Sequence, residues 1–300
     1  MVERVPNLRV RPVRSYEAGA ALTRLMSHES ARLSAIGGAL REWLVNRLSP
    51  EERELTAAIE ERRRFLLEST REISVIDYGA GEPDSARTEE EMEKGVRSAA
   101  LVSDLCKASN PEFWATFLFK LVRMLEPLFC VELGSSVGIS ASYLATALSI
   151  NGKGDLITLE GCPEIAGIAE ETVQSLNLCN ASVIAGPFRE TLKGILQTSK
   201  PVDFLFNDGH HDHDAVLNYF EYVMPSLSDE AALVFDDISW TRGMRDAWSG
   251  IEDDRRVTAS IDLGRMGIAL TGGGSRVKEK FRIQIRGEQA WMNDPRRRRF

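Results

Sequence analysis

The second half of the chain alternates short apolar runs with amphipathic stretches, and this rhythm constrains the fold more than any other feature. Strands and helices are expected in turn at 128–133 (strand), 139–149 (helix), 155–160 (strand), 163–177 (helix), 181–185 (strand), 188–197 (helix), 202–206 (strand), 213–227 (helix), 231–235 (strand) and 242–250 (helix). Such alternation forms a parallel sheet, because each helix crosses over and packs on a face of the sheet. The sequence therefore predicts an α/β fold.

The end of the chain departs from this rhythm. The runs 257–263 and 266–270 flank Gly264 and Arg265, which predicts an antiparallel hairpin, and 281–286 is a candidate for one more edge strand. We therefore expect a sheet of seven strands that is parallel except for its C-terminal hairpin.

Helices are expected before the sheet. Apolar residues at helical spacing predict helix from about residue 20 to 70, with a kink or break at Gly37 and Gly38. Ser49, Pro50 and Glu52 predict a new helix start, since they can form a capping box with proline in the first turn.

A loop is expected at 73–94, where glycine, proline and acidic residues gather, and helices are expected at 95–108 and 111–126, the second capped by Asn110. We divide the chain into a helical N-terminal extension or lid (1–110), the main domain (111–286) and a basic tail (287–300).

Composition excludes several classes of partner. The net charge of −8 disfavours nucleic-acid binding, and the basic run Arg296–Arg299 is interpreted as a solvated tail. No apolar run approaches the roughly 20 residues that span a bilayer, and the N-terminus lacks a secretory signal. We expect a cytoplasmic protein without a membrane partner. The four cysteines contain no C-x-x-C pair, which favours buried free thiols over disulfides or zinc.

The first strand of the alternating region ends in a turn of small residues that suits a ligand. Its candidate binding residues are Glu132, Gly134, Ser135, Ser136 and Gly138. Small residues let the chain turn sharply and let a ligand approach the backbone. The spacing is not that of a dinucleotide fingerprint, and an acid in the turn suits a cationic ligand better than a pyrophosphate. A tight turn without any ligand remains the alternative.

The second strand ends in Glu160, which lies 22 positions after Gly138 and is followed by Gly161. In nucleotide-binding α/β folds, a carboxylate at this place accepts hydrogen bonds from the ribose hydroxyls. A solvated charge is the alternative for an isolated glutamate, but the preceding turn favours the ligand.

With these motifs in order, residues 113–271 resemble the class I S-adenosylmethionine-dependent methyltransferases, and the first motif is similar to that of catechol- and caffeoyl-CoA-type O-methyltransferases. The resemblance implies a Rossmann-like seven-stranded fold with S-adenosylmethionine as the cofactor. It implies that the first turn surrounds the methionine moiety, that Glu160 holds the ribose, and that Gly186, Pro187 and Phe188 border the adenine. The segment Asp77–Gly81 also looks like one in bacterial members, and the loop Asp77–Glu82 is our candidate for a lid edge.

Acidic residues and histidines follow the next two strands. Asp208 comes after the fourth strand, and Asp236 and Asp237 come after the fifth. Neighbouring carboxylates repel one another, which a divalent cation such as Mg²⁺ would relieve. The metal-dependent small-molecule O-methyltransferases resemble this layout, which implies a metal site at Asp208, Asp236 and Asp237. The alternative is that Asp208 contacts cofactor or substrate while Asp236 and Asp237 cap the next helix.

Three of the four histidines lie within four residues, and they include two candidates for the general base. An imidazole can accept a proton near neutral pH. The resemblance implies two readings of this cluster. The base of some relatives lies at the position of His210, and a cofactor or substrate contact of others lies at the position of His211. Both remain catalytic candidates together with Asp208.

These features predict an enzyme that transfers a methyl group from S-adenosylmethionine to an oxygen of a small-molecule acceptor, with a divalent cation as a possible assistant. Two alternatives stay open: a metal-independent N-methyltransferase, and a non-catalytic partner protein that binds S-adenosylmethionine. A homodimer through the N-terminal helices is also considered.

Overall fold

A sheet of eight strands forms the centre of the protein. The computed structural model describes residues 16–79, 87–197, 200–272 and 278–285. The strands lie in the order β10-β8-β9-β7-β6-β3-β4-β5, and β9 alone runs antiparallel to its neighbours. Their bounds are β3 Phe129–Leu133, β4 Asp155–Glu160, β5 Ala181–Ala185, β6 Val202–Asn207, β7 Leu227–Phe235, β8 Val257–Asp262, β9 Gly267–Thr271 and β10 Glu279–Arg282.

This sheet confirms the Rossmann-like α/β class and the C-terminal hairpin, but the predicted number of seven strands is wrong. The eighth strand is β10, which pairs in parallel with β8 at the sheet edge. Its inward-facing Phe281 is buried, and this burial stabilises a segment that is only four residues long.

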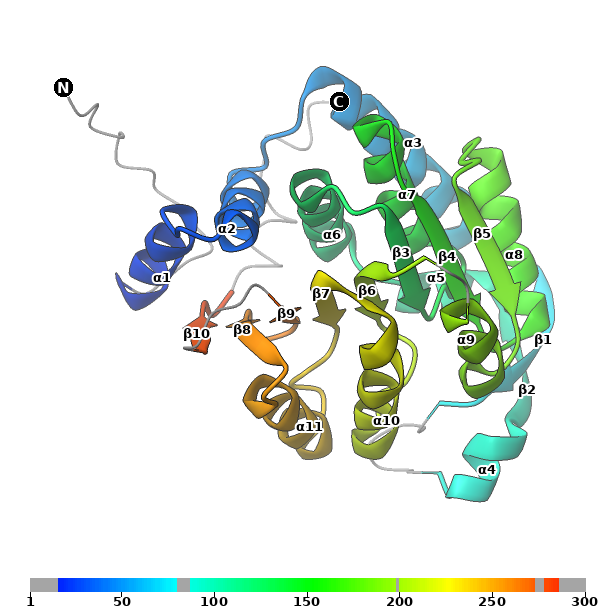
Figure 1. Cartoon of the computed structure of the whole chain (residues 1–300). Coiled ribbons are helices and arrows are strands. Elements are labelled where there is room, and N and C mark those ends of the chain that lie inside the picture. The colour runs from blue at the N-terminus through cyan, green and yellow to red at the C-terminus, as the bar shows by residue number, and fades with distance from the viewer. Residues whose placement is uncertain (1–15, 80–86, 198–199, 273–277, 286–300) are drawn as a thin grey trace.

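Helices cover both faces of the sheet, as parallel crossovers require. One face carries α6 (Glu112–Leu125), α7 (Ile139–Asn151) and α8 (Pro163–Ser175). The other carries α9 (Phe188–Leu196), α10 (His213–Val223), a short 3₁₀ turn at Met224–Ser226 and α11 (Arg242–Asp253). Figure 1 shows α10 and α11 on the side of the sheet opposite to α6. The central strand β3 is buried along its whole length.

The N-terminal part begins with three helices, α1 (Tyr16–Met26), α2 (Ala31–Leu44) and α3 (Pro50–Leu67). The capping box predicted at Ser49 and Glu52 is confirmed. The predicted kink or break at Gly37 and Gly38 is wrong, because both lie inside α2 and the chain turns before it. Gly37 is needed for packing instead: a Cβ there would lie 2.7 Å from the backbone nitrogen of Met26.

A two-stranded antiparallel sheet follows, where the sequence predicted a loop and the start of a helix. Strands β1 (Glu72–Asp77) and β2 (Val96–Leu101) pair with each other, and α4 (Glu89–Lys94) lies between them in the chain. Ile73 and Val75 alternate inward and are buried, which gives β1 the period of a strand. Only α5 (Val102–Ala108) remains of the helix predicted at 95–108.

The N-terminal helices share one hydrophobic core with the main domain. Trp43 of α2 packs against three aromatic residues of α6, and its Nε1 donates a hydrogen bond to the Phe113 carbonyl oxygen at 2.7 Å. The buried Lys120 of α6 pairs with Glu42 at 2.9 Å and with Glu52 at 2.7 Å. The division expected at residue 110 therefore crosses a continuous core. The expected tail, 287–300, lies outside the described residues.

The cysteines are free thiols, as the sequence predicted, and three of the four are buried. Within the described ranges, no helix has the length and apolar character needed to cross a lipid bilayer.

Candidate active site

A pocket of about 370 Å³ lies at the carboxyl ends of β3, β4 and β6, within the size range of small-molecule sites. Open α/β sheets bind ligands at this edge. The first turn makes the pocket possible: Gly134 has φ +100°, and a Cβ there would lie 2.7 Å from the Cα of Gly209. The loops after β3 and β6 can therefore touch only because both residues are glycines.

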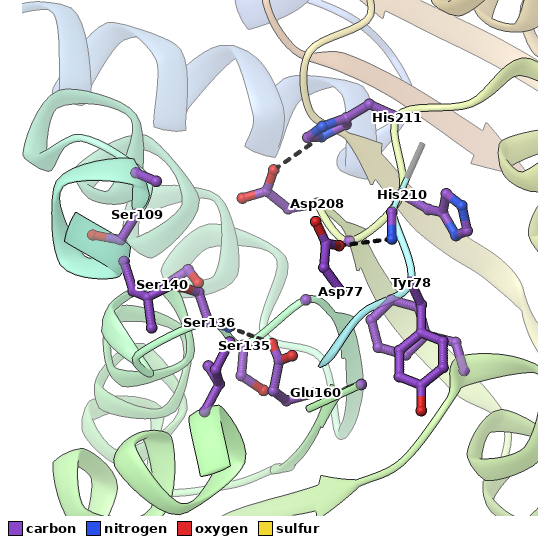
Figure 2. Close-up of a pocket in the computed structure, with 18 of the residues that line it drawn as sticks. Asp77, Tyr78, Ser109, Ser135, Ser136, Ser140, Glu160, Asp208, His210 and His211 are labelled. Atoms are coloured by element: carbon purple, nitrogen blue, oxygen red, sulfur yellow. Dashed lines mark hydrogen bonds and ion pairs between the residues drawn. The ribbon is translucent and has the colours of Figure 1, made fainter. Parts of the chain in front are cut away.

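One end of the pocket is organised by Glu160. Its Oε2 accepts a hydrogen bond from the backbone N–H of Ser136, and its Oε1 accepts one from Cys162, both at 3.0 Å. Figure 2 shows Glu160 beside Ser135 and Ser136, across the pocket from the histidines. Burial raises the pKa of the Glu160 carboxyl to about 7. The carboxylate thus ties β4 to the first turn and still faces the pocket.

The residues expected around the methionine moiety separate into two layers. Gly134, Ser135 and Ser136 line the pocket, and so does Ser140 of α7, which the sequence analysis did not select. Glu132 lies beneath them, fully buried, and its Oε2 accepts a hydrogen bond from Thr158 at 2.5 Å. Burial raises the pKa of Glu132 to about 7. Glu132 is therefore placed to support the turn, not to line the pocket.

Two of the expected glycines also lie behind the pocket wall. Gly138 has φ +86° and a Cβ there would approach the Cα of Ala169 to 3.0 Å, so it allows α7 to pack against α8. Gly186 has φ +135° and its N–H donates to the carbonyl oxygen of Glu160 at 2.8 Å. In contrast Gly161, Pro187 and Phe188 line the pocket.

Asp208, His211 and Asp237 gather at the other end of the pocket. His211 Nε2 lies 3.5 Å from an oxygen of Asp208 and 3.8 Å from an oxygen of Asp237. One ligand atom from each residue lies within 4.8 Å of the other two. Asp237 has a left-handed backbone with φ +51°, a rare conformation that occurs often at functional sites.

Burial and neighbouring charges shift the pKa values of Asp208 and His211. Burial, followed by the charge of Asp236, raises the pKa of Asp208 to about 6. Burial alone would lower the pKa of His211, but its ion pair with Asp208 and the charge of Asp237 outweigh burial and raise it. The neighbouring His210 differs, since burial lowers its pKa and its Nδ1 lies 3.3 Å from the Tyr219 hydroxyl. Figure 2 shows His211, not His210, directed at Asp208.

Asp236 stands apart from the trio expected to hold a metal. Its side chain is fully buried, and Nε and Nη2 of Arg265 donate to its two oxygens at 2.9 and 3.0 Å. Asn110 Nδ2 donates to the same carboxylate at 2.8 Å, and the Asp237 N–H donates at 2.8 Å. Each oxygen of Asp236 already accepts two hydrogen bonds. The structure therefore places His211, and not Asp236, beside Asp208 and Asp237.

Arg265 and Asn110 line the pocket, and sequence reasoning missed both. Arg265 was assigned only to a hairpin turn, and nothing in its local pattern indicates which strand end it reaches. Asn110 was expected to cap α6, but Pro111 occupies the cap position without a side-chain bond. The Asn110 amide instead reaches Asp236 and, at 3.4 Å, Asp208.

The N-terminal strands supply another wall of the pocket. Asp77, Tyr78 and Gly79 line it, and the Tyr78 ring lies so close to Gly161 that a Cβ there would approach it to 2.9 Å. Asp77 accepts a hydrogen bond from the Gly79 N–H at 2.8 Å and pairs with Arg87 at 2.8 Å. The described part of the expected lid edge therefore borders the pocket, whereas the rest, 80–82, lies outside the described residues.

Comparison with known proteins finds one matching family model. Residues 131–238 match a family model described as a methyltransferase domain, and this range runs from within β3 to the loop that follows β7. None of the curated proteins matches the chain. The family match agrees with the resemblance inferred from the strand-end motifs.

Solved structures with a similar arrangement include two O-methyltransferases. One, from Bacillus cereus in complex with S-adenosylhomocysteine, is 22% identical, with 56% of this chain and 85% of that chain covered and a TM-score of 0.49. The other is TomG from Streptomyces achromogenes, which is involved in tomaymycin synthesis and was solved with S-adenosylmethionine. It is 21% identical, with 55% of this chain and 82% of that chain covered and a TM-score of 0.48.

Proposed function

We propose that this chain, whose residues 131–238 match a methyltransferase domain, transfers the methyl group of S-adenosylmethionine to an oxygen of a small-molecule acceptor. The observation that carries the proposal is the position of Glu160 at the end of β4. Each of its oxygens accepts one backbone N–H and keeps a lone pair for a ribose hydroxyl.

The rest of the pocket suits the cationic end of the same molecule. Asp208 and Asp237 line it at the strand ends, and Ser135, Ser136 and Ser140 line it with hydroxyls or backbone amides. A sulfonium and an ammonium gain from nearby carboxylates, whereas a pyrophosphate would be repelled. The charge of the site therefore favours S-adenosylmethionine over a dinucleotide.

S-adenosylmethionine supplies a methyl group on a positively charged sulfur, which is already a good leaving group. His211 accepts the proton of the acceptor hydroxyl, and Asp208 at 3.5 Å stabilises the resulting imidazolium. The acceptor oxygen uses its electron pair to bond to the methyl carbon, and the electrons of the broken carbon–sulfur bond stay on sulfur. The protein's main task is alignment, which can lower a barrier by about 7–11 kcal/mol.

The residues do not fit the divalent cation expected at Asp208, Asp236 and Asp237. Asp236 is saturated by Arg265, Asn110 and a backbone amide. The guanidinium also lies 3.4 Å from an oxygen of Asp237, where its charge would repel a cation. We therefore derive no step through a metal.

Calorimetry with S-adenosylhomocysteine, followed by turnover of methyl-labelled S-adenosylmethionine, tests the proposal. Phenols, carboxylic acids and amines serve as acceptors, each with and without a chelator. We expect binding, and label in the oxygen acceptors that a chelator does not reduce. Transfer only to amines would favour the N-methyltransferase, and binding without turnover of any acceptor would favour a non-catalytic partner protein.

A further inference from the structure

Arg265 reaches the pocket from the turn of the C-terminal hairpin. It lies in the turn between β8 and β9, on the antiparallel side of the sheet, after Gly264 with φ +92°. The Arg265 carbonyl oxygen accepts a hydrogen bond from the Ile238 N–H at 2.9 Å. The hairpin is thereby attached to the loop that follows β7, and the side chain of Arg265 is directed at the strand ends.

The guanidinium is held in one orientation. Nε and Nη2 bind the two oxygens of Asp236 in a bidentate pair, and Asp236 is itself fixed by Asn110 and by the Asp237 N–H. Such planar pairs fix both groups and direct the remaining N–H groups. The pair with Asp236 uses Nε and Nη2, and Arg265 is one of the pocket-lining residues.

Arg265 also changes the charge balance around the pocket. Asp208, Asp236 and Asp237 together would repel any acceptor that carries a negative oxygen. The charge of Arg265 is permanent, because guanidinium does not deprotonate in proteins. The protein therefore contains its own cation at the strand ends where a metal was expected.

We propose that the Arg265 guanidinium binds the reacting oxygen of the acceptor and selects acceptors with an acidic hydroxyl, such as phenols and enols. The inference rests on the proposed function and names its substrate class. A phenol, with a pKa of about 10, is within reach of His211 once a guanidinium stabilises the phenolate. An aliphatic alcohol is far less acidic, so the same guanidinium lowers its pKa too little for His211 to accept its proton.

The test uses 4-nitrophenol, whose phenolate absorbs visible light whereas the phenol does not. The probe is titrated from pH 5 to 9 with the full chain saturated by S-adenosylhomocysteine. We expect wild-type protein to lower the apparent pKa of the bound probe by about one unit, a tenfold preference for the phenolate. Arg265→Gln removes the shift, and Arg265→Lys keeps part of it.

Two controls separate charge from folding. Arg242 of α11 has a side chain that is 94% exposed, so Arg242→Gln changes the net charge equally and keeps the shift. Arg265→Gln leaves Asp236 buried without its main partner and can unfold the site. The double variant Arg265→Gln/Asp236→Asn removes both charges, and it too is expected to lose the shift.

Three results would overturn the inference: no probe binding to the wild type, an unchanged shift in Arg265→Gln, or a shift that a chelator abolishes. A wild type that fails to bind S-adenosylhomocysteine refutes the proposed function itself. A wild type that binds it and shows no phenolate preference refutes only the role of Arg265.

Discussion

Replacing Glu160 by Gln is the sharpest perturbation of the proposed cofactor site. Both oxygens of Glu160 accept a backbone N–H, from Ser136 and from Cys162. In Glu160→Gln an NH₂ group replaces one oxygen and must face one of these N–H groups, donor against donor. One hydrogen bond from the ribose to a charged group is lost, worth about 1.5–3 kcal/mol, and the other becomes a weaker neutral bond.

The total loss is about 2–4 kcal/mol, which corresponds to about 30- to 1000-fold weaker binding of S-adenosylhomocysteine. Isothermal titration calorimetry measures it directly. The matched control is Glu170→Gln on the exposed side of α8, where the side chain accepts a hydrogen bond from Gln174. If Glu160→Gln binds within about threefold of the wild type, Glu160 does not hold the ribose and the reasoning fails.

Three further predictions follow from the same geometry. The pKa of Glu160 is raised to about 7, and its ionised form accepts the ribose hydroxyls. The affinity for S-adenosylhomocysteine should therefore be full above pH 7 and fall by up to about tenfold per pH unit below it. Calorimetry at several pH values should find this pH dependence reduced in Glu160→Gln. His211→Ala should lower kcat by about 10²–10⁴-fold. It should also remove the increase in rate that occurs as the pH rises past the pKa of His211, which is itself raised. His213→Ala changes an exposed histidine paired with Asp214 and should leave the pH–rate profile intact. Lys120→Met should destabilise the fold by about 1.5–3 kcal/mol in urea unfolding, because the buried Glu52 loses its bond from Lys120 and keeps only the one from Arg123 as a charged partner. Lys107→Met, at an exposed pair with Asp104, should cost less than about 1 kcal/mol, and equal losses would show that the buried pair adds nothing.

The strand ends were predictable because their signals are local. A buried parallel strand is recognised in the sequence as a short apolar run, and the residue after it must lie at the carboxyl edge of the sheet. Glu160, Asp208 and Asp237 could therefore be assigned to one rim before any coordinates were known. The ranges 155–160 and 181–185 match β4 and β5 to the residue.

The N-terminal strands were missed because their stability is not local. Strand β1 is a six-residue segment with a charge at each end, and it is held by pairing with β2 and by burying Ile73 and Val75. Its partner β2 lies beyond α4 in the chain. No window along the chain contains both halves of that pairing.

The sequence alone determined the class of fold, the edge of the sheet that binds a ligand, and the acidic and imidazole groups at that edge. Only the tertiary structure decided which of those groups face the pocket. It paired Asp236 with Arg265 and Asn110, placed Glu132 beneath the turn, and directed His211 at Asp208. The physical reason is that hydrophobic periodicity specifies elements one at a time, whereas the buried Asp236 and Glu132 are positioned by partners more than twenty residues away in the chain.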